Sequence, residues 1–344
     1  MKILYGVQGT GNGHISRARV VARQFQEAGA DVDYLFSGRP KEKFFDMEVF
    51  GNCMYHRGLT FQTENGQTLY GKTLLKNSLT RLVWDILQLD TSSYDYIITD
   101  FEPITAWAGK LRNVPVIGIG HQYAFEHSVP CDGETALARN IMKYFAPAQR
   151  SFGLHWHHFD SSILPPIIDT SIQHQPGKDT RTILVYLPFE NQDYVQSLLR
   201  EVRGYRFVVY SPDLKDQDLG HLSLRKNSLK GFKEDLESAH GVICNSGFEL
   251  ISECLHLGIP VLTKPLQKQM EQLSNAEALR HLNYATTSKE LSQEIIRSWL
   301  EKGIRRRSVK YPDVASTLVK WLLDEHREQP ANLSKRLWEQ VGYS

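Results

Sequence analysis

Residues 245–276 of this chain read NSGFELISECLHLGIPVLTKPLQKQMEQLSNA, and this stretch decides which fold the sequence predicts. The apolar run 241–244 before it is typical of a buried parallel strand, and the apolar spacing after it predicts a helix. Gly247 stands at the sharp turn between them, where a ligand can approach the backbone closely. The free N–H groups and the positive dipole end of the helix make this turn, with Asn245 and Ser246 beside it, a receptor for phosphate.

Two glutamates on the predicted helix allow different interpretations. Ser246 and Glu249 form the pattern S-x-x-E, which is typical of a capping box at a helix start. Glu253 follows Glu249 by four residues on the same face, where a carboxylate could accept two hydroxyls of a ribose beside the phosphates. An ordinary solvated helix carboxylate is the alternative for Glu253.

A second strand and helix follow directly. Residues 260–262 predict a buried strand, Pro265 ends it, and a polar helix start carries Glu271 and Gln272. The series S-G-x5-E, G-x-P and E-Q-x2-N-A resembles the donor-site signature of the GT-B glycosyltransferases. It is most similar to the plant and animal UDP-glycosyltransferases and to the N-acetylglucosaminyl transferase of peptidoglycan synthesis. The resemblance implies a diphosphate at the glycine turn, a ribose at Glu253, and sugar hydroxyls at Glu271 and Gln272.

Length and composition restrict the class of protein. A chain of 344 residues exceeds the usual size of one core, so two domains are expected. Lys and Arg number 40 against 39 Asp and Glu, which gives no sign of a nucleic-acid or membrane partner. The four cysteines form no C-x-x-C pair, which suits reduced thiols, and no apolar run is long enough to span a bilayer. These features predict a cytoplasmic protein.

The N-terminal residues predict a strand, a glycine-rich loop and a helix. An apolar strand at 3–7 precedes the loop 9–13, and apolar residues at the 3.6-residue period continue to about residue 28. The glycines are spaced G-x-G-x-G rather than G-x-G-x-x-G, and the strand at 32–36 ends without an acidic residue for a ribose, which disfavours an NAD enzyme. Arg39 could serve NADP, so an NADP-dependent oxidoreductase stays an alternative.

The loop GTGNGH and Arg17 resemble the glycine-rich loop that faces the cleft in the GT-B family, whose histidine often acts as a base. We therefore expect Gly11 and Gly13 at the donor and His14 as the catalytic base. At a helix start the positive dipole end favours the neutral, proton-accepting imidazole. A helix cap is the alternative for His14.

Two more residues are predicted at the same sheet edge. Asp100 ends an apolar strand at 96–99, and His121 follows the strand at 114–119; the carboxyl ends of parallel strands meet at one crevice. Asp100 resembles the aspartate that orients the histidine in UDP-glycosyltransferases, with helix N-capping as an equal alternative. His121 is the reserve base.

The sequence predicts three segments. Residues 1–165 are expected to form a Rossmann-like acceptor domain and residues 166–325 a Rossmann-like donor domain. The resemblance to GT-B glycosyltransferases implies that a helix within residues 326–344 packs back on the first domain, with Trp321 or Trp338 as anchors. The irregular stretch 51–76 is the candidate for acceptor recognition. The same resemblance implies that Phe232, in a predicted loop, packs on the nucleotide base, and a core aromatic is the equal alternative.

The sequence thus predicts an α/β protein of the GT-B fold, in which two doubly wound domains face a cleft. The expected activity is metal-independent transfer of a sugar from a nucleoside diphosphate sugar, with a UDP-sugar as the expected donor, to an acceptor hydroxyl. The acceptor could be a glycan, a lipid-linked molecule or a small molecule, and no bound cofactor is expected. Arg17 or Lys268 would help to meet the diphosphate charge. A nucleotide-sugar hydrolase or epimerase and a non-catalytic nucleotide-sugar sensor remain alternatives. The basic run 305–307 is too short to support contact with a membrane surface.

Overall fold

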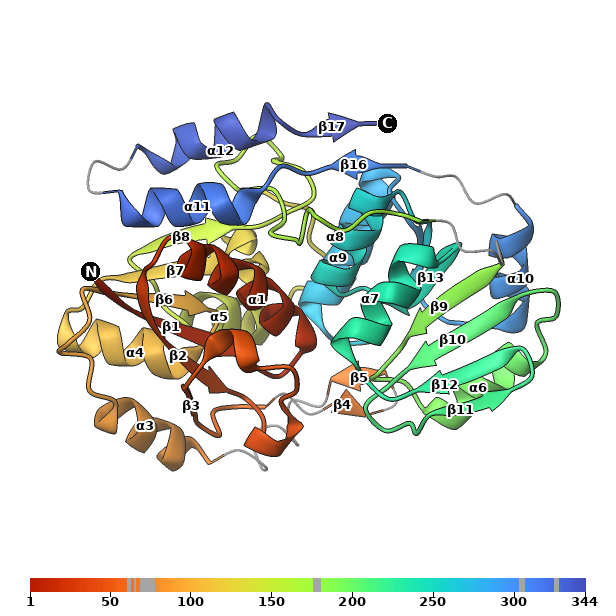
Figure 1. Ribbon diagram of the computed structural model, residues 1–344, viewed down its shortest axis with the longest axis horizontal. Coiled ribbons are helices and arrows are strands. Elements are labelled where there is room, and N and C mark those ends of the chain that lie inside the picture. The colour runs from red at the N-terminus through yellow and green to blue at the C-terminus, as the bar shows by residue number, and fades with distance from the viewer. Residues whose placement is uncertain (61–62, 65, 69–77, 176–180, 303–306, 325–327) are drawn as a thin grey trace.

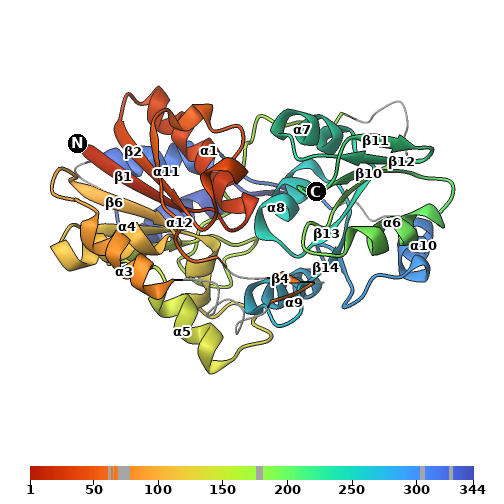
Figure 2. The same cartoon turned by 90° about the horizontal axis from the view of Figure 1, so that it is seen from below.

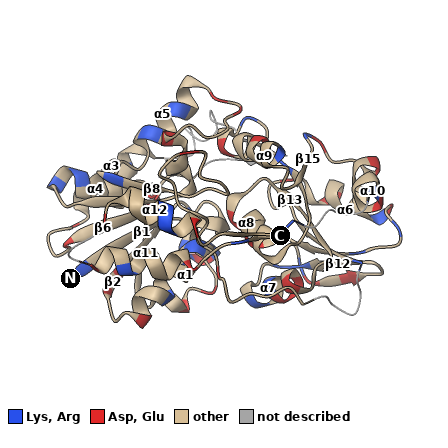
Figure 3. Ribbon diagram, turned by 90° about the horizontal axis from the view of Figure 1, so that it is seen from above, with Lys and Arg blue, Asp and Glu red and all other residues tan. Residues whose placement is uncertain are grey.

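The computed structural model describes residues 1–60, 63–64, 66–68, 78–175, 181–302, 307–324 and 328–344. Two α/β halves lie side by side (Figure 1). The N-terminal half is built on a six-stranded sheet within residues 2–153, and the C-terminal half on a seven-stranded sheet within residues 182–287. Basic and acidic residues are interspersed over both halves (Figure 3), in keeping with a formal net charge of +1.

The N-terminal sheet has the strand order β3-β2-β1-β6-β7-β8, and its neighbouring strands are parallel. The strands are β1 Lys2–Gln8, β2 Asp31–Ser37, β3 Cys53–Tyr55, β6 Tyr96–Asp100, β7 Val116–Gly120 and β8 Arg150–Gly153. The helices of this half are α1 Asn12–Glu27, α3 Leu79–Gln88, α4 Pro103–Arg112 and α5 Ala136–Tyr144, with 3-10 turns η1 Lys41–Lys43, η2 Glu48–Phe50 and η3 His121–Glu126. A small hairpin pairs β4 Thr63–Glu64 with β5 Gln67–Thr68.

Alternate residues of β1 enter different apolar clusters. Ile3, Tyr5 and Val7 pack in the cluster that contains the apolar face of α1, whereas Leu4 packs in the cluster that contains Ile104 of α4. Helices therefore cover both faces of the sheet. This explains why its strands are continuous apolar runs rather than alternating ones.

The C-terminal sheet has the order β11-β12-β10-β9-β13-β14-β15, with β11 antiparallel and the other pairs parallel. Its strands are β9 Thr182–Tyr186, β10 Arg206–Tyr210, β11 Gln217–Leu219, β12 Leu222–Arg225, β13 Gly241–Asn245, β14 Val261–Lys264 and β15 Thr286–Thr287. Its helices are α6 Gln192–Arg200, α7 Leu229–Ser238, α8 Phe248–Leu257, α9 Met270–Leu282 and α10 Gln293–Glu301.

Both sheets change the direction of strand addition beside their first strand, since β1 lies between β2 and β6, and β9 lies between β10 and β13. Ligands of doubly wound sheets bind at the carboxyl ends of the strands at such a point. Gln8 ends β1 and Tyr186 ends β9, and both line one shared cavity between the halves. Figure 2 shows that the two sheets belong to separate halves of the molecule.

The end of the chain returns to the N-terminal half. Helix α11, Val314–Leu323, packs against α1, and Trp321 makes an edge-to-face contact with Phe152 of β8. Helix α12, Pro330–Trp338, follows beside α11 (Figure 1), and the strands β16 Val309–Lys310 and β17 Gly342–Tyr343 pair antiparallel. Trp338 Nε1 donates a hydrogen bond to the carbonyl of Ile163 at 2.7 Å. The return begins with α11, earlier than residue 326, and the three predicted boundaries stay predictions.

Candidate active site

The cavity between the halves has a volume of about 240 Å³. Its N-terminal wall contains the loop from β1 to α1, η3 and the apolar side chains of α5, and its C-terminal wall contains the starts of α8 and α9. Most predicted site residues line it, namely Gly11, Gly13, His14, His121, Asn245, Gly247, Glu271 and Gln272. Asp100 lies directly behind His14, and Ser246 is buried beneath the turn at Gly247.

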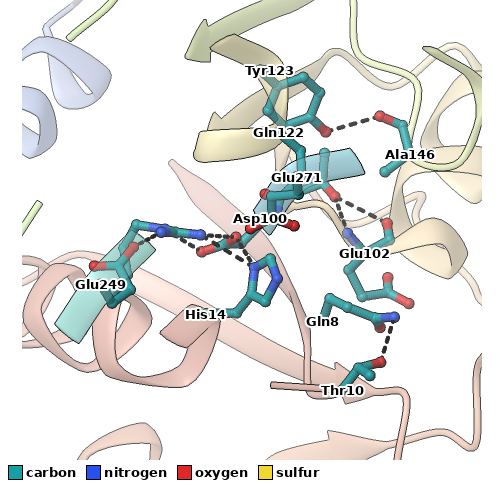
Figure 4. Close-up of polar contacts among 12 residues, drawn as sticks. Gln8, Thr10, His14, Asp100, Glu102, Gln122, Tyr123, Ala146, Glu249 and Glu271 are labelled. Carbon is teal, nitrogen blue, oxygen red and sulfur yellow. Dashed lines mark hydrogen bonds and ion pairs between the residues drawn. The ribbon is translucent and has the colours of Figure 1, made fainter. Parts of the chain in front are cut away.

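The structure brings His14 and Asp100 together (Figure 4). His14 Nδ1 lies 2.6 Å from Asp100 Oδ1, so the ring donates through Nδ1 and leaves Nε2 as the nitrogen that can accept a proton. The imidazole is 15% exposed at the cavity, whereas the carboxylate is fully buried. Phe101, which follows Asp100, has a left-handed φ of 52°, an unfavourable conformation that re-aims the chain at the end of β6.

Arg17 holds Asp100 from the other side. Its Nε and Nη2 donate to the two carboxylate oxygens at 2.8 and 2.7 Å, and its Nη1 pairs with Glu249 of the opposite half. Burial by itself would raise the pKa of Asp100, but the charge of Arg17 and the hydrogen bonds from His14 and Arg17 hold it below the ordinary value. Asp100 is therefore ionised, and Arg17 is not free to meet a diphosphate as the sequence suggested.

Helix capping at this place is done by another residue, so the alternative role of Asp100 as the N-cap is wrong. Glu102 is the N-cap of α4, and its carboxylate accepts from the backbone N–H of Ile104 at 2.9 Å and of Thr105 at 2.7 Å. The helix begins at Pro103, so the N-cap position falls on Glu102, two residues after Asp100.

His121 is not placed to act as the reserve base. It is 1% exposed, with Nδ1 2.7 Å from the carbonyl of Leu154 and Nε2 2.6 Å from Asn275 Oδ1. Its ring stacks on Phe248 with a centroid distance of 4.1 Å. Burial lowers its pKa, and each ring nitrogen lies within hydrogen-bond distance of an oxygen atom, so neither nitrogen is open to a substrate. His121 thus joins the two halves in this conformation.

The turn at Gly247 differs from the predicted capping box. Gly247 is the N-cap of α8 and no side chain caps the helix, because Ser246 Oγ bonds to Thr263 Oγ1 at 2.9 Å and Glu249 pairs with Arg17. The capping-box interpretation of Ser246 and Glu249 is therefore wrong. The first N–H groups of α8 face the cavity without a side-chain acceptor, which is the arrangement that suits an anion.

Asn245 also lines the cavity, and its amide is only partly satisfied. Its Nδ2 donates to Glu190 Oε1 and to the carbonyl of Lys264, both at 3.1 Å, while its buried Oδ1 has no hydrogen-bond partner. Glu190 is held in place by an ion pair with Lys264 at 2.7 Å. The unpaired amide oxygen is an acceptor that a ligand hydroxyl can satisfy.

Glu271 and Gln272 stand in the first turn of α9 and have different partners. Glu271 Oε2 accepts a hydrogen bond at 3.1 Å from Gln122 Nε2 of the N-terminal half. Gln272 Oε1 accepts from the backbone N–H of Leu266 at 3.0 Å and so orders the loop before the helix. Sequence reasoning missed Gln122, although its position directly after β7 was a usable signal.

Glu253 and Phe232 line an adjoining cavity of about 110 Å³, which shares Gly13 and Glu249 with the first. Phe232 lies within α7, which begins at Leu229, and not in a loop as predicted, because Ser228 caps the helix by accepting from the N–H of Gly231. Its ring packs edge-on against Tyr186 and Tyr210. A base-stacking role for Phe232 stays a prediction.

Burial raises the pKa of Glu253 to about 7, with Asp169 adding to the shift and Lys233 opposing it. Between the ordinary value of about 4.3 and this value the folded protein binds a proton that the unfolded chain does not, so stability falls as pH rises through this window. Glu253→Gln removes this penalty without changing shape. We expect the variant to be more stable than the parent by about 2 kcal/mol at pH 8 and equally stable near pH 4.

Thermal unfolding of both proteins at the two pH values measures this difference. An equal midpoint at pH 8 would show that the Glu253 carboxylate is better solvated than its buried position indicates.

Other predicted features lie outside the cavity or outside the described residues. Lys268 does not line the cavity, and the Arg39 guanidinium donates to Asn12 and stacks on Phe44. The predicted acceptor stretch 51–76 falls partly on residues 61–62, 65 and 69–76, which the structure does not describe.

The described part of the chain has neither a metal-binding cluster nor a membrane-spanning helix. No group of three or more His, Cys, Asp or Glu side chains is placed to hold a metal there, and metal independence stays a prediction. The D-x-D triplets 31–33 and 216–218 fall on the start of β2 and on the edge strand β11. None of the helices described has the length and apolar character to cross a bilayer.

Comparison with known families assigns the chain. Residues 1–303 match the family described as glycosyl transferase family 1. The chain belongs to this glycosyltransferase family. A similar curated protein is an uncharacterized glycosyltransferase of Methanosarcina acetivorans, with 24% identity over 99% of this chain and 97% of the relative.

Solved structures of glycosyltransferases share the fold of this glycosyltransferase. The spinosyn rhamnosyltransferase SpnG aligns with a TM-score of 0.57 and 16% identity, over 98% of this chain and 100% of that one. MurG of Acinetobacter baumannii aligns with a TM-score of 0.51 and 13% identity over 99% and 100%, and SnogD of Streptomyces nogalater with 0.51 and 15% over 98% and 99%. The predicted GT-B fold and the resemblance to GT-B glycosyltransferases are therefore confirmed.

Proposed function

We propose that this glycosyltransferase moves a hexosyl group from a UDP-sugar to an acceptor hydroxyl, with His14 as general base and without a bound metal. One observation carries the proposal: the His14–Asp100 pair of the N-terminal half faces the uncapped start of α8 across a single cavity. A proton acceptor and an anion receptor therefore stand on opposite walls.

The reaction follows from this arrangement. The acceptor oxygen attacks the anomeric carbon, its proton passes to His14 Nε2, and the bond from the anomeric carbon to the diphosphate breaks with its electron pair on the phosphate oxygen. Asp100 keeps Nδ1 protonated and stabilises the imidazolium that forms. A direct displacement of this kind inverts the anomeric centre. The N–H groups at the start of α8 would stabilise the departing diphosphate in place of a metal.

The two ends of the donor find candidate partners on either side of the diphosphate turn. Glu253, in the adjoining cavity, is suited to the ribose hydroxyls, and the unpaired Oδ1 of Asn245 with Glu271 is suited to the sugar hydroxyls. The acceptor would enter past Ala138, Ile141 and Met142 of α5, which give that wall an apolar surface.

The direct test is release of UDP from a panel of UDP-sugars, with and without glycan, lipid-linked and small-molecule acceptors. Slow release that an acceptor accelerates supports the transferase. Fast release without any acceptor would favour the hydrolase alternative, and binding of UDP-sugar without release would favour the sensor. Release from other nucleoside diphosphate sugars, but not from UDP-sugars, would overturn the choice of UDP.

A second prediction concerns the ribose. Glu253→Ala is expected to weaken UDP binding about tenfold, because one charge-assisted hydrogen bond is lost while the fold is retained. Calorimetric titration with UDP measures the change, and titration with uridine monophosphate should show the same ratio, since the ribose is common to both. Unchanged affinity for both nucleotides would remove Glu253 from the donor site.

A further inference from the structure

Buried polar contacts join the two halves beside the cavity. They include Gln122 Nε2 with Glu271 at 3.1 Å, His121 Nε2 with Asn275 at 2.6 Å, and the ion pair of Arg17 with Glu249. Arg17 differs from the other contacts because the same side chain also holds Asp100, the partner of His14. One residue thus contacts both the catalytic pair and the opposite half.

The geometry of Arg17 makes this double contact specific. As whole residues, Arg17 is 2% exposed and Glu249 is 8% exposed. Two nitrogens of Arg17 donate hydrogen bonds to Asp100, and its Nη1 forms an ion pair with Glu249. Its Nη2 also lies 3.2 Å from His14 Nδ1. The planar guanidinium can satisfy two carboxylates at once, which a lysine ammonium cannot do with the same geometry.

The charges of this cluster depend on Glu249. Without Glu249, the positive charge of Arg17 cancels the negative charge of Asp100. A neutral His14 then leaves the buried cluster neutral. With Glu249 in contact, the cluster carries one net negative charge, which a proton on His14 would cancel. A buried cluster favours the state of lower net charge, so the approach of Glu249 favours proton uptake by His14.

We propose that Arg17 is a positioning residue through which the contact of Glu249 makes His14 a stronger proton acceptor, so that the catalytic pair reaches full strength only when the two halves are apposed. This inference rests on the proposed role of His14 as the base. It assigns Glu249, at the start of the donor helix α8, a function other than binding the donor.

Other ionisable groups around this cluster are accounted for. They are Tyr5 of β1, His121 of η3 and Glu271 of α9, each of which has an electrostatic interaction with Arg17, and Tyr123 of η3, a phenol that burial keeps neutral and that interacts with Asp100. Burial raises the pKa of Tyr5 well above its ordinary value and lowers the pKa of His121. Both side chains are therefore held in their uncharged forms. Glu271 contributes a second negative charge from the same half as Glu249, which acts in the same direction.

The test is a titration of the His14 ring in the full-length protein, followed by NMR and assigned among the 13 histidines by the signal that His14→Ala removes. In Glu249→Gln, which keeps the shape but not the charge, the titration midpoint should fall by about one pH unit, the order expected from a unit charge several ångströms away. Glu249→Asp keeps the charge but places it farther from Arg17. Its titration midpoint should lie between those of the parent and of Glu249→Gln. An unchanged or higher midpoint in Glu249→Gln would overturn the proposal.

Turnover supplies the second measurement, with UDP-glucose and UDP-N-acetylglucosamine as probes and UDP release as the signal. Glu249→Gln should lower kcat about three- to tenfold with little change in the donor KM, because a weaker base slows the chemical step. Glu277→Gln is the matched control, since Glu277 pairs with Arg280 on α9 outside the cluster and its loss should move neither kcat nor the midpoint. A raised donor KM with an unmoved midpoint would make Glu249 a donor ligand and overturn the proposal.

The failure of this inference and that of the proposed function are distinguishable. Full UDP release by His14→Ala would refute the base and with it the proposed function, whatever the midpoint does. Loss of release in His14→Ala with an unmoved midpoint in Glu249→Gln would refute only the coupling through Arg17.

Discussion

His14→Ala is expected to lower turnover by about 10²–10⁴-fold, the usual contribution of a general base, while the affinity for UDP stays nearly unchanged. The imidazole stands on the N-terminal wall of the cleft, whereas the proposed nucleotide contacts are on α8 of the C-terminal wall. Steady-state release of UDP from UDP-sugar, together with calorimetric titration of UDP, separates the two effects.

The control for this prediction is His158→Ala, since that ring lies between β8 and β9 and does not line the cavity. It should keep the activity of the parent. The pH profile gives an independent check, because transfer by the parent should fall on the acid side as the imidazole becomes protonated. Full activity of His14→Ala would exclude a histidine base, since His121 has both nitrogens engaged.

Gly247→Val is expected to reduce UDP affinity on the order of 100-fold, because two or more hydrogen bonds from the start of α8 to the diphosphate would be blocked. The loss of a glycine N-cap should cost no more than about 1 kcal/mol of stability. The backbone at Gly247 has φ of −73° and ψ of 147°, which any residue adopts, and a Cβ placed there meets nothing within 4 Å. The fold therefore does not require glycine at this position. A ligand that approaches the backbone does require it.

Gly247→Ala should show a smaller loss than Gly247→Val, because the obstruction grows with the side chain. Calorimetry with UDP measures the loss, and thermal unfolding checks that the fold is intact. Parent-like affinity in Gly247→Val would place the diphosphate elsewhere than at the start of α8.

Local sequence patterns predicted the fold well. The apolar runs at 3–7, 96–99 and 182–187 became β1, β6 and β9, each with bounds that differ by a residue or so. Such runs specify buried strands wherever helices cover both faces of a sheet. A glycine at the strand-to-helix turn indicates where a ligand can approach the backbone. The strand–turn–helix at 241–257 could therefore be predicted from the sequence.

The partners of each side chain were less predictable. Ser246 and Glu249 have the spacing of a capping box, yet Thr263 and Arg17 hold them instead, and the N-cap expected at Asp100 falls to Glu102. Local spacing describes only neighbours along one helix. Local spacing does not specify which side chain from another element will form the contact.

The sequence by itself determined the two doubly wound halves and put His14, Asp100 and Gly247 at strand ends that border a cleft, because strand direction and turn position are local properties. Only the tertiary structure decided that Arg17 lies between Asp100, 83 residues away, and Glu249 of the other half, and that both nitrogens of His121 are engaged. Two of these contacts, Arg17 with Glu249 and His121 with Asn275, join the two halves. Their geometry depends on the packing of α1 against α8, which no periodicity within either segment encodes.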